Sequence, residues 1–407
     1  MQLEENARLR RIDMKWIVYE GRQVLALTDS LRLSGGQTIL VPPPLVPLLA
    51  LCDGTRNLPE LQSDFNLRTG QSIPEDQIRA FVDGLDKAFL LQNRRYREAV
   101  AQAMDRYRSA PHRPPRLAGA GYPSDPVQLS AAFDGYLQQA EVADAAAWEG
   151  VAGVISPHID YHRGWRTYAA TWQAARSAVQ AAELIIILGT DHAGLPGTMT
   201  LTRQSYGTPW GPLPTDVDLV DRLASALGDE AAFAQEPHHL GEHSIELAST
   251  WVHYAAGGEP KFVLPVLCGS HDAILGAGSD SGQSIWDAVD IMARAARQRR
   301  TLVVAAGDLS HMGPVFGDAS PLEEADKAQL EALDGEWLEA ACTGDSAALT
   351  AHILSRRDPT RICGSAPIHY MAHILQGATG QVLTYEQCPA DDTFGSLVSI
   401  AGALFSD

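Results

Sequence analysis

Short, uninterrupted apolar runs alternate with helix-like stretches over the larger, C-terminal part of the chain. The clearest run, Leu184–Leu188, contains only Leu and Ile and leads directly into Gly189, Thr190, Asp191 and His192. Runs of this kind are typical of strands that are buried on both faces of a sheet. Further strands are predicted at Val151–Ser156, Lys261–Leu267, Thr301–Ala306, Val382–Glu386 and Leu397–Leu404. Helices are predicted at Val127–Trp148, Trp165–Ala182, Val217–Leu227, Ser244–Ala256, Ser284–Arg299, Ala325–Cys342 and Ala366–Gln376. This alternation predicts an α/β fold with a mixed or parallel sheet.

The first 108 residues follow a different pattern. Met14–Ala26 and Gln37–Val41 have the composition of short strands, and Ile78–Leu90 repeats apolar residues at helical spacing. Ser72 and Glu75 have the spacing of a capping box at the start of that helix. These elements predict a small winged-helix-like α+β domain. It loosely resembles the PqqD-like peptide-recognition domains found with radical-SAM and peptide-modifying systems; a helical appendage that stabilises the main domain is the alternative.

Charge and cysteine content narrow the classes of function. The chain of 407 residues has a net charge of −19, yet residues 1–108 hold 15 Lys and Arg against 14 Asp and Glu. The acidic excess therefore lies in the second part, which argues against binding to nucleic acids or anionic membranes. Five cysteines without a CxxC pair, and the charged residues at the start of the chain, predict a cytoplasmic protein with reduced thiols.

Histidines are concentrated in the region of alternating strands. None of the 13 lies in the first 111 residues, and four closely follow predicted strands, namely His158, His192, His271 and His311. If the strands are parallel, their C-terminal loops share one edge of the sheet, where the four rings can converge. Neutral imidazoles are suited to Zn, Fe and Cu. For any one of these histidines alone, a hydrogen-bonded structural role is the simpler interpretation.

Cys363 and the residues before one helix add further candidates. Cys363 precedes a predicted helix, whose N-terminus lowers the pKa of a thiol, although a small buried side chain is an equal alternative. Glu242 and His243 stand before the helix at Ser244–Ala256. The two acids that flank His243, Glu242 and Glu246, either fix the tautomers of metal-binding histidines or complement the helix dipole as an acidic first turn. The chain has no HExxH, HxE…PCxxC or GxSxG motif, which argues against zinc protease, deaminase and serine hydrolase sites.

Several short motifs follow one another in a fixed order along the main domain. They are RLAGAGYPSD (116–125), PH (157–158), LGTDH (188–192), YGTP (206–209), EHSIE (242–246), GDLSH (307–311) and ICG (362–364). This ordered set resembles the Memo family, also called the AmmeMemoRadiSam system protein B family, over residues 113–404. The proline-rich segment before it is predicted to be a linker. The chain therefore divides into residues 1–108, a linker at 109–115 and a main domain at 116–407.

The resemblance implies a fold and a set of functional residues. The Memo family is similar in fold to the LigB-type class III extradiol dioxygenases, which use non-haem Fe(II), so a mixed sheet flanked by helices is expected. The matching motifs imply three metal ligands, His158, His192 and Cys363. They also imply two catalytic residues, Asp308 and His311, and two further residues near the pocket, Glu242 and His243.

Two loops depart from the family pattern. The family's PHAGY loop reads Pro157-His158-Ile159-Asp160-Tyr161 here, and the usual pair of histidines is His192-Ala193, preceded by Asp191. Asp160 and Asp191 are therefore expected to make the pocket more acidic. Such a pocket favours a divalent ion over Cu(I), or indicates a changed substrate.

Together, these patterns predict a metal-dependent, dioxygenase-like oxidoreductase that acts on a small molecule or peptide. Fe(II) is favoured as the metal, ahead of Cu and then Zn. The expected partners are the substrate and a radical-SAM or peptide-modifying system, with no nucleic acid and no membrane. The alternative is a non-catalytic scaffold that binds a peptide or protein in a degenerate enzyme pocket. A metal-independent hydrolase using Cys363 and a histidine ranks below both.

Overall fold

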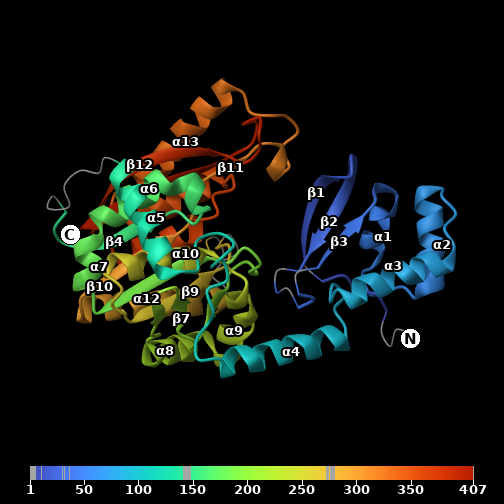
Figure 1. Ribbon diagram of the computed structural model, residues 1–407, viewed down its shortest axis with the longest axis horizontal. Helices are drawn as coiled ribbons and strands as arrows, with labels where there is room; N and C mark the ends of the chain where they lie inside the picture. The colour runs from blue at the N-terminus through green and yellow to red at the C-terminus, as the bar shows by residue number, and fades with distance from the viewer. Residues whose placement is uncertain are drawn as a thin grey trace. The chain divides into compact units, whose positions relative to one another are not determined.

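The computed structural model describes residues 6–10, 12–29, 31, 33–35, 37–140, 148–271, 275 and 280–406. The chain folds into two compact units, Met1–Ala110 and Pro111–Asp407 (Figure 1). Within the described residues, no helix combines the length and the apolar character needed to cross a bilayer.

The first unit packs a small antiparallel sheet against helices around one apolar core (Figure 1). Its strands β1 (Asp13–Tyr19), β2 (Arg22–Thr28) and β3 (Thr38–Val41) pair in that order. They are followed by η1 (Pro43–Leu45), α1 (Val46–Leu51), α2 (Leu58–Thr69), α3 (Glu75–Lys87) and α4 (Arg94–Ser109). Leu27, Phe65 and Val82 are completely buried where the sheet and the helices meet. The unit therefore has the predicted α+β composition, whereas α4 was not predicted.

The capping box predicted at Ser72 and Glu75 is wrong. The N-cap of α3 is Pro74, in an extended conformation, and no side chain caps this helix. Ser72 therefore lies two residues too early for a capping role. A capping box begins α2 instead, where Asn57 Oδ1 accepts a hydrogen bond from Glu60 N at 3.0 Å and the Glu60 carboxylate accepts one from Asn57 N at 2.8 Å.

The second unit is built on one mixed sheet, which confirms the predicted α/β fold. Four strands run parallel in the spatial order β4-β10-β5-β9: β4 (Val151–Ser156), β10 (Thr301–Ala306), β5 (Leu184–Thr190) and β9 (Val263–Cys268). Antiparallel strands extend both sides: β6 (Met199–Leu201) pairs with β9, β13 (Leu397–Ser406) pairs with β4, and β11 (His311–Met312) and β12 (Thr379–Pro389) pair with β13. A separate ribbon contains β7 (Tyr206–Thr208) and β8 (Gly211–Leu213).

Helices cover both faces of this sheet (Figure 1). One layer contains α8 (Val217–Leu227), α9 (Asp229–Phe233), α12 (Asp280–Gln298), α13 (Glu324–Cys342), α14 (Ser346–Arg356) and α15 (Ser365–Ile374). The other contains α5 (Pro126–Gln139), α6 (Tyr161–Ala174), α7 (Arg176–Ala181) and α10 (Ser244–Ala255). Short 3-10 turns lie at η3 (Glu236–Leu240) and η4 (Pro314–Phe316).

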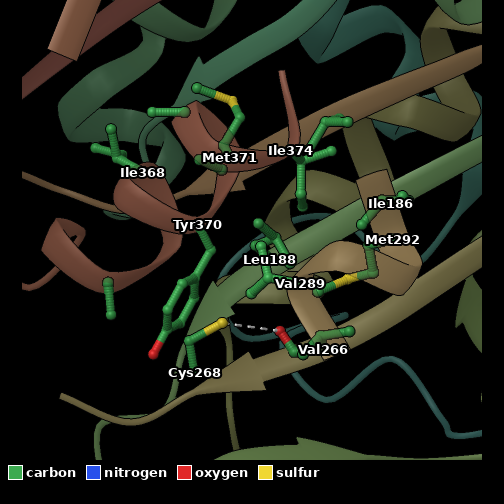
Figure 2. Close-up of a cluster of buried hydrophobic side chains, with 14 of the residues drawn as sticks. Ile186, Leu188, Val266, Cys268, Val289, Met292, Ile368, Tyr370, Met371 and Ile374 are labelled. Carbon is green, nitrogen blue, oxygen red and sulfur yellow. Dashed lines mark hydrogen bonds between the residues drawn. The ribbon is translucent and has the colours of Figure 1, made fainter. Parts of the chain in front are cut away.

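The buried run in β5 shows why apolar residues follow one another without a break. Ile186 and Leu188 belong to one apolar core, and Ile185 and Ile187 belong to the other. Successive side chains of a strand point to opposite faces, so a strand between two helical layers needs apolar residues at every position. Figure 2 shows the first core, in which Ile186 and Leu188 lie opposite side chains of α12 and α15.

Most elements of the main domain lie close to their predicted bounds. β4, β10 and α8 agree with the prediction at both ends. The helix predicted at Val127–Trp148 ends at Gln139, and residues 141–147 lie outside the described residues. The helix predicted at Trp165–Ala182 begins at Tyr161 and is divided into α6 and α7. α14 and the short strands β6, β7, β8 and β11 were not predicted.

The predicted linker at 109–115 is divided between the two units. Ser109 is the last residue of α4, whereas Pro111 begins the second unit. Arg113 is completely buried within that second unit. Its backbone N donates to Ser205 O at 2.8 Å, and its carbonyl accepts from Gly207 N at 2.8 Å. This part of the segment therefore contributes to the core of the main domain.

Candidate metal centre

The candidate site lies at the C-terminal ends of β4, β10 and β5. β10 comes last of the three in the chain, yet it lies between the other two. His158, Asp308 and His192 each follow their strand by two residues, so they meet at one edge of the sheet. The ring centroids of His158 and His192 are 5.0 Å apart.

His158 is buried and held in one orientation. Its Nδ1 lies 3.0 Å from the carbonyl of Ala306, which can only accept, so Nδ1 carries the proton and Nε2 keeps a free lone pair. Nε2 lies 3.3 Å from the Sγ of Cys363. Burial lowers the pKa of His158, which favours the neutral ring that a metal ligand requires.

Glu242 orients His192 and His243 together. One carboxylate oxygen accepts from His192 N at 3.1 Å and lies 3.0 Å from His192 Nδ1. The other accepts from His243 N at 2.7 Å and lies 3.1 Å from His243 Nδ1. Burial opposes the charge of Glu242, but the two histidines outweigh burial and hold its pKa well below the usual range. His192 has its pKa raised well above its ordinary value, because Glu242 outweighs the effect of burial.

Glycine lets the helix that follows Glu242 approach β5. A Cβ at Gly189 would lie 2.6 Å from both Ser244 Oγ and a side-chain carbon of Ile245. The Ser244 hydroxyl donates to the Thr190 carbonyl at 2.8 Å. The start of α10 is therefore fixed against the end of β5, which places the Glu242 carboxylate beside His192.

A second close approach of backbones positions Cys363. A Cβ at Gly307 would lie 2.3 Å from the Cα of Gly364, so the loop after β10 and the start of α15 touch directly. Cys363 Sγ also lies 3.5 Å from the carbonyl of Asp308. Burial raises the pKa of the thiol, but His158 outweighs this effect and lowers the pKa of Cys363 to about 7. The thiolate is thus accessible near neutral pH.

Asp308 and His311 lie on the loop after β10. Asp308 is buried, and its carboxylate accepts from His158 N at 2.7 Å and from Ile159 N at 3.2 Å. Burial raises the pKa of Asp308 and lowers that of His311. The Nδ1 of His311 lies 3.0 Å from the Leu309 carbonyl, so Nδ1 carries the proton and Nε2 keeps a lone pair.

Three residues expected in the pocket do not join these groups. The Asp191 carboxylate lies 2.8 Å from His238 Nδ1, and Asp160 is exposed at the N-cap of α6. Neither belongs to the compact groups of ligand side chains among the described residues. His271 does not converge with the other strand-end histidines, because its ring packs 5.1 Å from that of His369.

The sequence analysis missed Arg113, a buried residue whose side chain contacts the backbone of Glu242. Its guanidinium pairs with Glu246 and donates to the carbonyls of His239 and Glu242 at 2.8 and 2.9 Å. Both charged side chains are completely buried. Glu246 also accepts from Tyr122 Oη at 2.7 Å. A buried ion pair therefore fixes the backbone at Glu242.

The donor atoms suit a transition metal. His158, His192 and Cys363, called the trio below, each offer one ligand atom, and these atoms lie within 4.8 Å of one another. Imidazole nitrogen and thiolate sulfur suit Fe, Cu and Zn rather than Mg or Ca. A second group, His192, Glu242 and His243, is equally compact. The Glu242 carboxylate is already engaged with five N–H positions, so the trio offers the better ligand set.

Comparison with known proteins covers most of the chain. The family described as "Memo-like protein" matches residues 113–404. A MEMO1 family protein of Aquifex aeolicus is 23% identical over 376 residues, which cover 91% of this chain and 93% of the relative. Another from Thermus thermophilus is 26% identical over 331 residues, covering 81% and 93%. A third, from Methanosarcina acetivorans, is 24% identical over 292 residues, covering 71% and 96%.

These alignments differ in how much of the first unit they include. Pro111–Asp407 makes up 297 of the 407 residues. An alignment that covers 91% of the chain therefore includes much of the first unit, whereas one that covers 71% is no longer than the second unit. The family match includes the trio and the sheet up to Leu404 in β13. The chain belongs to the Memo-like protein family.

Proposed function

We propose that the protein is a metal-dependent oxidoreductase of the dioxygenase-like kind, acting on a small molecule or peptide. The observation that carries this proposal is the trio, whose three ligand atoms lie within 4.8 Å of one another. Three protein ligands leave further coordination positions for a substrate and an oxidant. The resemblance to LigB-type dioxygenases favours Fe(II), ahead of Cu and Zn.

The chain's own residues have distinct roles in this proposal. A bound metal supplies Lewis acidity and redox chemistry. The Ala306 carbonyl and the Glu242 carboxylate hold the rings of His158 and His192, which leaves Nε2 of each ring for the ligand position. His311 accepts or donates a proton at Nε2, because its Nδ1 is engaged by backbone carbonyls.

Metal content of protein purified without an affinity tag tests the site. The wild-type chain is expected to bind Fe or Cu, and His158→Ala, His192→Ala and Cys363→Ala are each expected to lose it. His352→Ala, on α14, is the matched control and should keep it. Unchanged metal content in the three variants would refute the assignment.

Oxygen uptake tests the reaction separately. The Fe(II)-loaded protein is given catechol-like compounds and peptides, and the consumption of O₂ is followed with an electrode. Turnover that is lost in His311→Ala but accompanied by normal metal content supports the acid/base role of His311. Metal binding without O₂ uptake on any substrate would support a binding role for the pocket instead.

A second candidate is a metal-independent hydrolase that uses Cys363 as nucleophile and His158 as base. The 3.3 Å separation of Sγ and Nε2 favours it, together with the lowered pKa of the thiol. Chelators and thiol alkylation distinguish the two candidates. An activity that survives metal removal but is lost on alkylation of Cys363 supports the hydrolase.

A further inference from the structure

A second pair of histidines lies inside the main domain, outside the trio. His271 follows β9, and His369 lies on α15; both are almost completely buried, with 2% and 1% of their surface exposed. Their ring centroids are 5.1 Å apart. The ring centroid of Trp286 lies 5.5 Å from that of His369, and the ring centroid of Tyr370 lies 6.1 Å from that of His271. Two strongly polar rings therefore share an apolar part of the core.

The hydrogen-bonding pattern fixes the tautomer of His369. The hydroxyl of Thr350 lies 2.7 Å from the Ser346 carbonyl and 2.7 Å from His369 Nε2. A threonine has one hydroxyl proton, and the carbonyl can only accept, so that proton goes to Ser346. His369 Nε2 must then donate to the hydroxyl. Nδ1 of His369 therefore carries a lone pair and no proton. Metal-binding histidines usually have this arrangement, in which the ring nitrogen that does not bind the metal donates its proton to a neighbouring group.

That lone pair has no partner among the described residues. His369 Nδ1, His271 Nε2 and the Tyr370 hydroxyl are all buried atoms without a hydrogen bond. Leaving a buried polar atom unsatisfied is costly, and native structures rarely do so. Three such atoms in adjoining side chains indicate that a guest atom belongs between the rings.

The charges around the pair restrict what the guest can be. Burial lowers the pKa of His271 to about 4 and that of His369 to about 3, so both rings are neutral at physiological pH. Within the part of the chain that the structure describes, the titratable groups that act on the pKa of His369 are the histidines His271 and His373, and no carboxylate is among them. A divalent cation between two neutral ligands would be a largely uncompensated buried charge. A monovalent, soft cation that accepts two nitrogen ligands is far better matched.

We propose that His271 and His369 form an internal Cu(I) site, separate from the trio. His369 Nδ1 and His271 Nε2 are the two ligands, and the Thr350 hydroxyl holds the His369 ring by accepting from Nε2–H. The ring of Tyr370 contacts both histidines. Its side chain also lies next to Cys268 (Figure 2). This site does not depend on the chemistry proposed for the trio, because it shares no ligand with it.

The decisive sample is the full-length variant His158→Ala/Cys363→Ser, in which the trio is disabled. Titrated anaerobically with Cu(I) against a chromophoric Cu(I) chelator, it is expected to bind one equivalent. X-ray absorption should show two nitrogen neighbours and no sulfur. Adding His369→Leu or His271→Leu to this variant should abolish binding, whereas adding His352→Leu should leave it unchanged.

A milder change tests the role of Thr350 without removing a ligand. Thr350→Val removes the acceptor for His369 Nε2–H and is expected to weaken Cu(I) binding roughly 10- to 100-fold. Circular dichroism confirms that each variant is folded. The proposal is overturned if the trio-disabled variant binds no Cu(I), if sulfur appears in its first shell, or if Zn(II) binds there and Cu(I) does not.

Discussion

The buried pair of Arg113 and Glu246 allows a quantitative test of how the main domain is held together. Replacing Arg113 with Met keeps most of the side-chain volume but removes the charge. Glu246 then stays completely buried without its ion pair, and the carbonyls of His239 and Glu242 lose their donor. Removing one partner of a buried pair typically costs about 3–5 kcal/mol. Glu246 keeps its bonds from Arg116 N, Leu117 N and Tyr122, which limits the loss to this range.

Urea unfolding followed by tryptophan fluorescence measures this cost. Seven of the eight tryptophans lie after residue 110, so the signal reports mainly on the second unit. The control is Arg300→Met, whose partner Glu183 is solvent-exposed, and it should cost less than about 1 kcal/mol. The double variant Arg113→Met/Glu246→Gln should be more stable than Arg113→Met alone, because the unpaired charge has gone. Equal stabilities of Arg113→Met and Arg300→Met would refute the reasoning.

Two further predictions concern Cys363 and the glycine beside it. In metal-free protein, the rate of Cys363 alkylation should rise with pH around a midpoint near 7, since only the thiolate reacts. His158→Ala should move that midpoint upward, because the largest effect that opposes burial is then lost and only His192 still lowers the pKa of the thiol. Mass spectrometry of the modified peptide against pH measures the midpoint, and an unmoved midpoint contradicts the pairing of Cys363 with His158. Gly307→Ala should cost about 1–3 kcal/mol, because its Cβ would meet the backbone at the start of α15. Gly335→Ala, in an open position of α13, should instead stabilise by about 0.5–1 kcal/mol, and similar unfolding midpoints for both would show that the close approach does not matter.

The strands and their polar ends could be predicted because that information is local. An unbroken apolar run identifies a strand between two layers, and the residues within a few positions of its end lie at the edge of the sheet. His158 and His192 were found in this way. His271 carries the same signal, yet its ring lies in the helical layer beside His369. Which way a loop residue turns depends on its neighbours in space, and no periodicity reports on them.

The position of β10 and the role of Arg113 depend on distant parts of the chain. The order of strands along the sequence does not reveal that β10 lies between β4 and β5, and this insertion is what brings Asp308 next to His158. Arg113 lies in a proline-rich segment that predicts an exposed linker. Its burial is determined by Glu246, 133 residues later in the chain. The prediction of a capping box at Ser72 was wrong for a local reason, because Pro74 occupies the N-cap position of α3.

The placement of β10 also has a consequence for how the protein is made. The ligand at Cys363 is synthesised 205 residues after the ligand at His158. At ordinary rates of translation, roughly 10–40 s pass between the two. β4 and β5 are complete early in that interval, the strand that separates them follows only at Thr301–Ala306, and the thiol that completes the trio comes last. The nascent chain therefore exposes His158 and His192 before Cys363 has been synthesised. Selective metal binding by the complete trio is possible only when most of the domain has been translated.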